Sequence, residues 1–359
     1  MKPPSLLLFI INPVSARGRT LRQWQQTRRE LIQRQIAFQE YFTTCAGDAT
    51  AATRAALQAG CERVIAVGGD GTLNEVVSGY FSAAGTVINS AAVLGLMPSG
   101  TGSDFRRTLG VTSAQEALAV LQRQNVRLID VVRVEFPTAA ECNRYLVNVA
   151  SFGLGGEAVA LVNAWRNTWP RFIGGRARFT AAALWALTKS RKVPVTLRCD
   201  QAETARIQSE FFVVANGRFA GGGMMFAPQA SLADGLLDIV VTDDITRWDI
   251  LKELPRLQRG THIQHPKVKS LRAQQVEVTS ETPLAVDVDG ELAGYTPVRL
   301  TVLPAAVRFF VASPGGQNAG RFTGAASRAR LCPVQLQSAR LSAGESLGFR
   351  AAATWLMGM

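Results

Sequence analysis

A glycine-rich turn with one carboxylate follows a short apolar run near residue 64. The run Val64–Val67 ends in the Gly-Gly-Asp-Gly turn at Gly68–Gly71, and a helical pattern begins near Leu73. Glycine lets backbone N–H groups approach a phosphate, and a helix start adds partial positive charge. Asp70 adds a hard oxygen ligand that suits Mg²⁺. The turn thus indicates a seat for a metal-nucleotide, although a tight strand-to-helix connection without a ligand explains it equally well.

Two further loops of small and polar residues leave apolar runs in the same part of the chain. Asn12–Arg17 follows the run Leu6–Ile11, and Pro98–Asp104 follows the run Ala92–Met97. In an open parallel sheet, the loops at the carboxyl ends of the strands line one crevice, where ligands usually bind. We therefore expect the three loops to form one site.

The first 136 residues alternate apolar runs with helical patterns, which predicts an α/β domain around a mostly parallel sheet. The expected strands are Leu6–Ile11, Phe38–Thr43, Val64–Val67 and Ala92–Met97, and the expected helices are Gly18–Gln35, Ala49–Ala59 and Leu73–Phe81. Such an arrangement would carry the three loops at one edge of its sheet.

Beyond residue 136, short strands separated by Gly, Pro and Asp predict an antiparallel sandwich or barrel. The expected strands are Arg144–Val149, Val193–Leu197, Glu210–Ala215, Leu236–Val241, Gln275–Thr279, Leu284–Val288, Val298–Leu303 and Val307–Val311, with helical insertions near Glu157–Trp165 and Ile245–Leu257. Residues 313–359 are rich in Gly, Ala, Ser and Arg, and we expect them to lie outside the domains. The predicted division is 1–136, 137–312 and 313–359.

The charge of the chain is strongly positive, with 39 Lys and Arg against 27 Asp and Glu, a net charge of +12. This excess favours an anionic partner, which could be a nucleic acid, an anionic membrane surface or a phosphorylated small molecule. No apolar run reaches the roughly 18 residues that span a bilayer. Five scattered cysteines without a Cys-x-x-Cys pair suit reduced thiols in the cytoplasm.

The segment between residues 165 and 192 mixes aromatic and basic side chains. Its aromatic residues are Trp165, Trp169, Phe172, Phe179 and Trp185, and seven Lys or Arg residues lie among them. Aromatic rings and cations together suit a membrane interface with anionic lipid. A core-packed helix with a solvated basic face explains the pattern equally well.

Four motifs in order make the sequence resemble a known family. They are Asn12–Arg17, Gly68–Glu75, Pro98–Phe105 and Val288–Glu291. Together they resemble the diacylglycerol kinase catalytic-domain family, specifically the soluble bacterial lipid kinases related to sphingosine and ceramide kinases. The resemblance covers about residues 6 to 311. It implies a Rossmann-like or phosphofructokinase-like α/β nucleotide domain and a C-terminal β-sandwich, with the active site in the cleft between them.

The resemblance also implies which residues contact ATP. These are Asn12, Ser15, Arg17, Thr43, Gly69, Asp70, Gly71, Thr72, Leu73, Asn74, Glu75 and Thr101, with Asp70 near Mg²⁺ and Arg17 where the family commonly has lysine. Two residues depart from the family pattern. Ala16 replaces a glycine and Ser103 replaces an asparagine. A Cβ at position 16 would weaken nucleotide binding if the loop needs φ > 0.

By the same resemblance, Glu291 is the base that removes the proton of the lipid hydroxyl. Asp289 beside it and Asp70 are the other two expected catalytic residues. Read from the residues alone, Asp289-Gly290 is a hairpin turn. The stretch around Asp234 resembles the family's structural metal loop. There the Asp234 carboxylate and the carbonyls of Ser231 and Leu236 would hold Mg²⁺, with Asp130 linked through water.

The function that these patterns favour is an ATP- and Mg²⁺-dependent kinase acting on the hydroxyl of diacylglycerol or a related lipid. Its expected partners are the nucleotide and a lipid substrate at an anionic membrane surface, with no nucleic acid, because the basic residues follow no recognisable binding module. Its expected place is the cytoplasmic side of the inner membrane, as a peripheral protein. The alternatives are an NAD-kinase-like enzyme or a catalytically inactive lipid- or nucleotide-binding regulator. The oligomeric state stays open, with a homodimer as one option.

Overall fold

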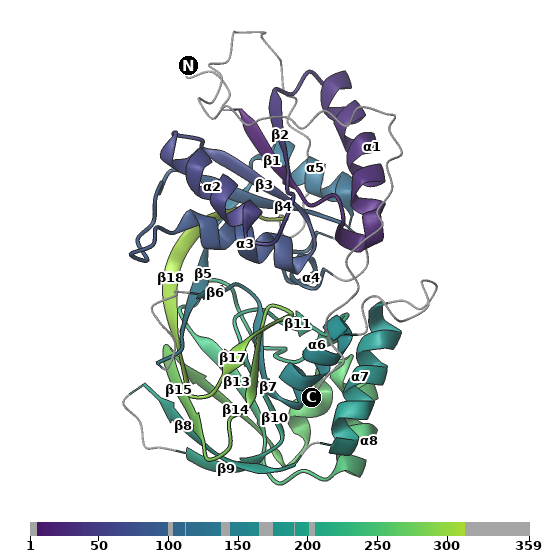
Figure 1. Ribbon diagram of the computed structural model, residues 1–359, viewed down its shortest axis with the longest axis vertical. Helices are drawn as coiled ribbons and strands as arrows, with labels where there is room; N and C mark the ends of the chain where they lie inside the picture. Colours follow the sequence, from purple (N-terminus) through teal and green to yellow (C-terminus); the bar gives the residue numbers. More distant parts are fainter. Residues whose placement is uncertain are drawn as a thin grey trace, which may run out of the picture.

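The computed structural model describes residues 6–99, 103–111, 113–137, 144–164, 175–189, 191–200 and 205–312. Within them the chain forms an N-terminal α/β domain and a C-terminal β-sandwich, which confirms the predicted fold class (Figure 1). Thr101, the tail 313–359 and the aromatic stretch 165–174 lie outside the described residues.

The N-terminal domain is built on four parallel strands in the order β2-β1-β3-β4. The strands are β1 (Leu7–Ile11), β2 (Phe38–Phe42), β3 (Arg63–Gly68) and β4 (Val93–Pro98). All four fall where the apolar runs predict them. Strands β1, β3 and β4 are almost wholly buried because helices cover both faces of the sheet.

Helices connect these strands and pack on the two faces of the sheet. They are η1 (Ser15–Gly18), α1 (Arg19–Gln33), α2 (Asp48–Gln58), α3 (Asp70–Tyr80), α4 (Phe105–Thr108) and α5 (Ala114–Arg123). Helices α2 and α3 lie side by side, joined by a hydrogen bond of 2.9 Å from Thr50 Oγ1 to the carbonyl of Glu75. Helix α1 meets α5 through Arg34, whose Nη1 donates to Gln122 Oε1 at 2.9 Å. Right-handed crossovers put α1 on the face opposite α2 and α3.

Two antiparallel sheets form the C-terminal sandwich around one apolar core. Apart from the two strands shared with the N-terminal domain, its strands are β6 (Arg144–Leu146), β7 (Val149–Gly153), β8 (Val193–Cys199), β9 (Ala205–Ser209), β10 (Phe211–Ala215), β13 (Leu237–Thr242), β14 (Val268–Ala273), β15 (Gln275–Ser280), β16 (Ala285–Val288) and β17 (Glu291–Tyr295), with the short pair β11 (Phe219–Ala220) and β12 (Met224–Met225). The sequence patterns did not predict β9, β11, β12, β14 or β17, several of which are half-exposed and lack a long apolar run.

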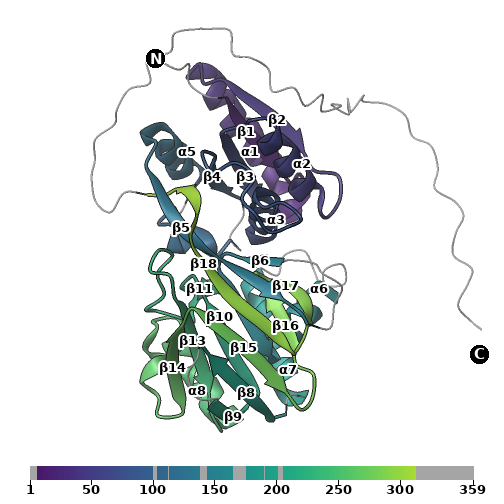
Figure 2. The same cartoon turned by 90° about the vertical axis from the view of Figure 1, so that its left-hand side faces the viewer.

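Two long strands run from one domain into the other (Figure 2). They are β5 (Val126–Glu135) and β18 (Val298–Phe310), which pair antiparallel along most of their length. The two expected strands Val298–Leu303 and Val307–Val311 are thus one strand, interrupted by an irregularity at Ala305 with φ +50°. Their upper ends belong to the N-terminal core and their lower ends to the sandwich core, so the domains share a continuous sheet.

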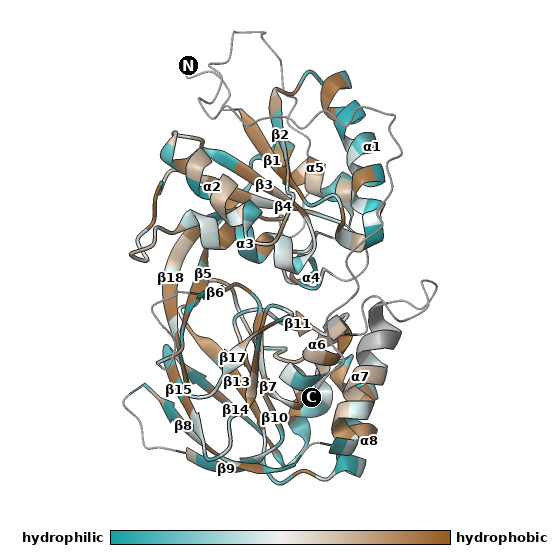
Figure 3. Cartoon of the chain, in the orientation of Figure 1, coloured by the Kyte–Doolittle hydropathy of each residue, from teal (hydrophilic) through white to brown (hydrophobic). Residues whose placement is uncertain are grey.

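A helical layer covers one side of the sandwich, with α6 (Leu154–Ala164), α7 (Gly175–Lys189), α8 (Arg247–Leu257) and the short η2 (Thr261–Gln264). Helix α7 lies inside the segment with mixed aromatic and basic residues, and Figure 3 shows hydrophobic residues over much of its length. Leu154, Ala186 and Leu187 form a small buried cluster where α6 and α7 pack. Among the described residues, no helix combines the length and apolar character that crossing a bilayer requires.

Candidate active site

Hydrogen bonds join the loops that follow β1, β3 and β4. Asn12 Nδ2 donates to Thr72 Oγ1 at 3.2 Å, which connects the loop after β1 with the first turn of α3. Thr20, buried at the start of α1, donates from its hydroxyl to Ser99 Oγ at 2.6 Å, at the end of β4. Ser15 Oγ lies against the same Thr20 hydroxyl. The three loops meet at the carboxyl edge of the sheet, as expected from the sequence.

Asp70 lies in the first turn of α3, three residues before the expected helix start. Its Oδ2 accepts from the backbone N–H of Asp104 at 2.7 Å, and its Oδ1 accepts from Ser103 Oγ at 2.9 Å and from the N–H of Phe105 at 3.3 Å. Burial raises the pKa of Asp70, and these hydrogen bonds offset part of that rise. Asp70 therefore fastens the loop after β4 to α3, and Ser103 supplies one of the donors.

The loop after β1 has three consecutive residues in the left-handed conformation. Ala16, Arg17 and Gly18 have φ values of +50°, +60° and +78°. Only glycine adopts this conformation without cost, so Ala16 and Arg17 hold backbone strain. Position 16 therefore has the positive φ that glycine adopts without cost, although this chain has alanine where the family has glycine.

The glycines of the turn after β3 differ in the space that a side chain would find around them. A Cβ on Gly68 would lie 2.5 Å from Thr72 Oγ1, so packing excludes a side chain there. A Cβ on Gly69 would meet nothing within 4 Å, which leaves the backbone at this point open to a ligand. A Cβ on Gly71 would lie 3.0 Å from Glu291 Oε1. The carboxylate of Glu291 thus lies against the start of α3 from the other domain.

A two-residue hairpin turn places Glu291. Strand β16 ends at Val288 and β17 begins at Glu291, with Asp289 and Gly290 between them at φ +52° and +91°. Positive φ at both central residues is the pattern of a tight Asp-Gly hairpin. The interpretation of Asp289-Gly290 as a hairpin turn is therefore compatible with a functional role of Glu291, because the hairpin carries this glutamate to the interdomain face.

Asp289 fixes this hairpin to both domains. Its carboxylate accepts from the backbone N–H groups of Val147, Asn148 and Val149 at 3.0, 3.0 and 3.2 Å, and from Asn74 Nδ2 on α3 at 2.8 Å. These bonds replace sheet pairing at Val147 and Asn148, which explains why the expected strand Arg144–Val149 is divided into β6 and β7. Burial raises the pKa of Asp289 to about 6, partly offset by these donors.

Asp287 is a buried carboxyl that the sequence reasoning missed. It lies on β16 two residues before Asp289, and its Oδ2 accepts from Ser151 Oγ at 2.8 Å. Burial raises its pKa to about 8, and the negative charges of Asp289 and Glu291 add to the rise. No local pattern singles out Asp287, because its burial depends on the pairing of β16 with β7 and β17.

Contacts from the β11 side of the sandwich close the same region. The backbone N–H of Gly222 donates to Asp104 Oδ2 at 2.6 Å, and the N–H of Arg218 donates to Thr108 Oγ1 at 3.2 Å. Gly221, Gly222 and Gly223 all have positive φ, which explains the glycine run. Asp104 thus receives a donor from the C-terminal domain while its own backbone N–H binds Asp70.

The structure separates the other expected nucleotide residues into two groups. Thr43 lies at the end of β2, where its N–H donates to the carbonyl of Ile11, beside the loop that holds Asn12. Leu73 and Glu75 point elsewhere: Leu73 is fully buried in the N-terminal core, and Glu75 Oε2 accepts from the N–H of Ala49 at the start of α2. Thr101 lies outside the described residues.

In the loop that the resemblance assigns to a structural metal ion, both of the named aspartates already have protein partners. The carboxylate of Asp234 forms an ion pair with Arg272, and both oxygens of Asp130 accept backbone N–H groups. Among the described residues no group of three His, Cys, Asp or Glu side chains could hold a metal. His262 and His265 hydrogen-bond to the backbone of Phe226 and of Lys267, so they do not form a joint metal site.

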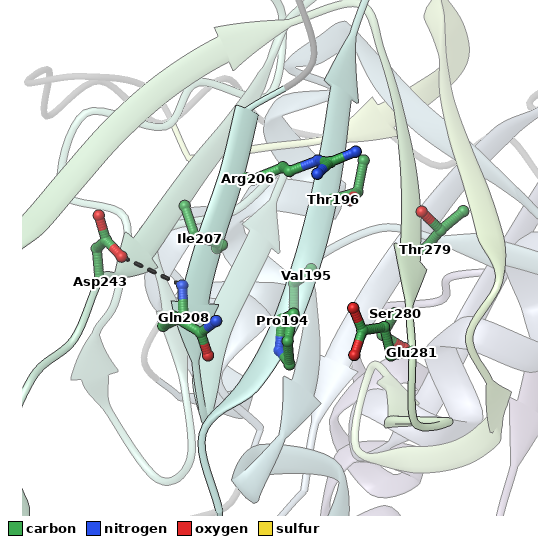
Figure 4. A pocket seen from close by; sticks show the side chains of 10 residues that line it. All are labelled: Pro194, Val195, Thr196, Arg206, Ile207, Gln208, Asp243, Thr279, Ser280 and Glu281. Carbon is green, nitrogen blue, oxygen red and sulfur yellow. Dashed lines mark hydrogen bonds between the residues drawn. The ribbon is translucent and has the colours of Figure 1, made fainter.

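A cavity of about 650 Å³ lies elsewhere, on the sandwich (Figure 4). Residues from β8, β9 and β15 line it, with Asp243 at one side, where its carboxylate accepts from the N–H of Gln208 at 3.2 Å. None of the residues expected in the active site lines this cavity. It lies at the far end of the sandwich from α3 (Figure 1).

Comparison with known proteins agrees with this two-domain fold. Residues 6–134 match the diacylglycerol kinase catalytic domain, and residues 148–311 match the YegS C-terminal NAD kinase beta sandwich-like domain. A diacylglycerol kinase of Mycobacterium tuberculosis is 30% identical over 304 residues, which are 83% of this chain and 93% of that protein. A protein of Pseudomonas aeruginosa named "probable lipid kinase YegS-like" is 31% identical over 264 residues, 73% of this chain and 80% of that protein.

A solved diacylglycerol kinase structure from Bacillus anthracis shares the fold, with a TM-score of 0.60 at 20% identity, covering 87% of this chain and 98% of that chain. The two matched domains together span the three loops and the hairpin that carries Glu291. This chain therefore belongs to the diacylglycerol kinase family of lipid kinases and is a phosphotransferase with an alcohol acceptor.

Proposed function

We propose that this protein transfers the γ-phosphate of ATP, with Mg²⁺, to the hydroxyl of diacylglycerol or a related lipid. The single observation that supports this most is the position of Glu291, whose carboxylate from the sandwich lies against the first turn of α3 in the N-terminal domain. A proton acceptor at the edge of a phosphate-binding turn is what phosphoryl transfer to an alcohol needs.

The nucleotide phosphates would bind over Gly69 and the N-terminal end of α3. The open space beside Gly69 and the helix start favour this place, because backbone N–H groups and the helix dipole attract phosphate. Asp70 and Asp104 place two carboxyl groups at this edge, close to where Mg²⁺ carried by ATP would lie. When bound there, the ion would neutralise phosphate charge; both carboxylates already accept protein donors, so we assign neither as its direct ligand.

Glu291 would accept the proton of the lipid hydroxyl, and Asp289 would position it. Asp289 receives four donors, three of them backbone N–H groups, so the hairpin that bears Glu291 is held in place. Of these donors, Asn74 belongs to α3, so the bond also fixes the base relative to the phosphate-binding turn. Positioning of this kind supplies much of the rate of phosphoryl transfer.

The lipid would reach the site from an anionic membrane surface that meets α7 and α8. Trp248 is 73% exposed, and Leu184 and Trp185 are also exposed, which is unusual for side chains of this size. Lys189 lies 6.0 Å from the centre of the Trp185 ring, and Lys252 is exposed on α8. Aromatic rings beside cations are typical of protein surfaces that bind anionic lipid. We place this face at the inner surface of the cytoplasmic membrane.

The test is phosphate transfer from ATP and Mg²⁺ to diacylglycerol, phosphatidylglycerol, ceramide, sphingosine and NAD, with the lipids in mixed micelles. We expect transfer to a lipid and none to NAD. Glu291→Gln should lower kcat by at least about 100-fold while leaving ATP binding near the wild-type value. Glu281→Gln is the matched control, because Glu281 is an exposed glutamate of the same domain.

Three other outcomes would each contradict part of this proposal. Phosphorylation of NAD alone would contradict the lipid acceptor. ATP binding without transfer to any acceptor would favour a regulator that has lost catalysis. Near-normal turnover by Glu291→Gln would contradict the role of Glu291 as the base.

A further inference from the structure

An arginine pairs with the carboxylate that the resemblance assigns to a structural metal ion. Arg272 lies on β14 directly opposite Asp238 of β13. Its Nη2 forms an ion pair with Asp234 Oδ2, and its Nε lies 3.5 Å from Asp238 Oδ1. One guanidinium therefore serves two carboxylates at the end of the loop 230–236.

The loop has a second anchor, in which backbone N–H groups take up both carboxylate oxygens of Asp130. Asp130 is buried on β5, and its two oxygens accept the N–H groups of Gly235 and Ala305, each at 2.7 Å. The backbone N–H of Asp130 donates to the carbonyl of Leu232 at 2.6 Å. These direct bonds tie the loop to β5, and Asp130 links it on to β18.

A further guanidinium supports the middle of the same loop. Arg218 Nε donates to the carbonyl of Ala230 at 2.9 Å, and its positive charge also acts on Asp238. Asp238 is almost fully buried, so it needs a compensating cation nearby. Two arginines thus supply positive charge to a cluster of two carboxylates.

Magnesium is a poor occupant of this arrangement. It requires near-octahedral oxygen ligands and resists losing its water shell. A guanidinium bound to Asp234 competes for the single side-chain ligand that the loop could offer, and it repels a second cation. Arg272 and Arg218 already supply two positive charges beside Asp234 and Asp238.

We propose that Arg272 is a built-in substitute for the structural metal ion. Its guanidinium neutralises Asp234 and Asp238 and holds the loop 230–236 against the interdomain strands. The loop of this chain consequently does not take up Mg²⁺. Arg272 is a positioning residue that takes no part in the transfer of phosphate. Its role at the loop therefore does not depend on the proposed reaction.

The test is thermal unfolding of the nucleotide-free full chain in MgCl₂ against NaCl of equal ionic strength. We expect the Tm of the wild type to respond equally to both salts. Arg272→Gln should lower the Tm by a few degrees, and Mg²⁺ should recover part of that loss because Asp234 and Asp238 become available. The double variant Asp234→Asn with Arg272→Gln should show no recovery. Arg299→Gln is the control, since Arg299 also pairs with a carboxylate on a neighbouring strand.

Three outcomes would overturn the proposal. They are an Arg272→Gln variant as stable as the Arg299→Gln control, an absence of recovery by Mg²⁺, and a wild-type response to Mg²⁺ that Asp234→Asn removes. Mn²⁺ titration followed by electron paramagnetic resonance checks the last point without any arginine variant. A tight Mn²⁺ site in the wild type that is lost in Asp234→Asn would contradict the substitution even if Arg272→Gln failed to fold.

Discussion

Three carboxyl groups on one hairpin lie in three different environments in this protein. Asp287 is buried beside Ser151, Asp289 binds four N–H donors, and Glu291 is exposed where the hairpin faces α3. Their environments differ because alternate residues of β16 and the following turn meet different neighbours. Burial consequently raises the pKa of Asp287 to about 8 and that of Asp289 to about 6.

The pH dependence of stability should reveal the buried Asp287. Its pKa rises from an ordinary value near 4 to about 8 in the fold, so the folded protein favours the neutral form. Its contribution to stability is present below pH 4 and is lost as the pH rises to 8. The free energy of unfolding should therefore fall by up to about 1.4 kcal/mol per pH unit from this group.

Asp287→Asn removes that titration and keeps a side chain of similar shape. We expect the variant to gain Tm relative to the wild type as the pH is raised from 5 to about 8.5, measured by circular dichroism. Asp243→Asn is the control, because Lys269 lowers the pKa of Asp243 and its contribution is lost only in acid. Parallel Tm curves for Asp287→Asn and the wild type would contradict the buried neutral carboxyl.

At the scale of elements, short turns fix the site more than the helices and strands that they connect. The loop after β1 uses three left-handed residues, and the hairpin before β17 uses two. These turns bring the carboxyl edge of one sheet against the hairpin end of another. Backbone conformation at single positions consequently decides where the functional groups lie.

Ala16 tests this dependence on backbone conformation. Its φ of +50° and ψ of +31° lie in the left-handed region, which costs a residue with a Cβ about 1 kcal/mol. Ala16→Gly should raise the free energy of unfolding by up to about 1 kcal/mol, less the entropy that glycine adds to the unfolded chain. Chemical denaturation measures the change, and ATP titration should show equal or tighter binding.

The control for this prediction is Ala51→Gly, at an exposed position inside α2. Glycine in a helix interior costs about 1 kcal/mol, so that variant should be less stable than the wild type. If both variants lost stability to the same extent, Ala16 would not adopt a strained conformation in solution.

At the scale of the whole molecule, two shared strands make one unit of two domains. Strands β5 and β18 pass through both cores (Figure 2). The carboxylate of Asp289 accepts hydrogen bonds from both sides of the interface. Asp104 donates its N–H to Asp70 and accepts from the N–H of Gly222 in the C-terminal domain. The two shared strands and these hydrogen bonds therefore hold the turn Gly68–Gly71, the proposed phosphate site, next to the proposed base Glu291. The helical layer with α7 and α8 lies on one side of the sandwich (Figure 1).

The proposed membrane face can be tested on the whole protein. Replacing Trp185 and Trp248 with alanine should weaken binding to phosphatidylglycerol vesicles by roughly tenfold, since two exposed aromatic anchors are lost. Sedimentation with vesicles measures this change, and higher salt should weaken binding by the wild type as well. Ile32→Ala is the control, because Ile32 is an exposed apolar residue on α1 of the other domain. Equal vesicle binding by all variants would contradict this face.

The fold class, the strands of the N-terminal sheet and the meeting of the three loops could all be predicted from the sequence. Continuous apolar runs specify buried parallel strands, and glycine-rich turns mark their carboxyl ends, so both features are local. The family likewise followed from motifs that are local in sequence. The Asp-Gly turn before Glu291 was also predictable, because it depends on two adjacent residues.

The individual side-chain contacts in and around the site are visible only in the tertiary structure. The carboxylate of Asp289 bonds to Asn74 across the domains, Leu73 and Glu75 turn away from the site, and Asp234 faces Arg272. These contacts join residues far apart in the sequence, so no local pattern encodes them. The burial that raises the pKa of Asp287 likewise exists only once β7 and β16 pair.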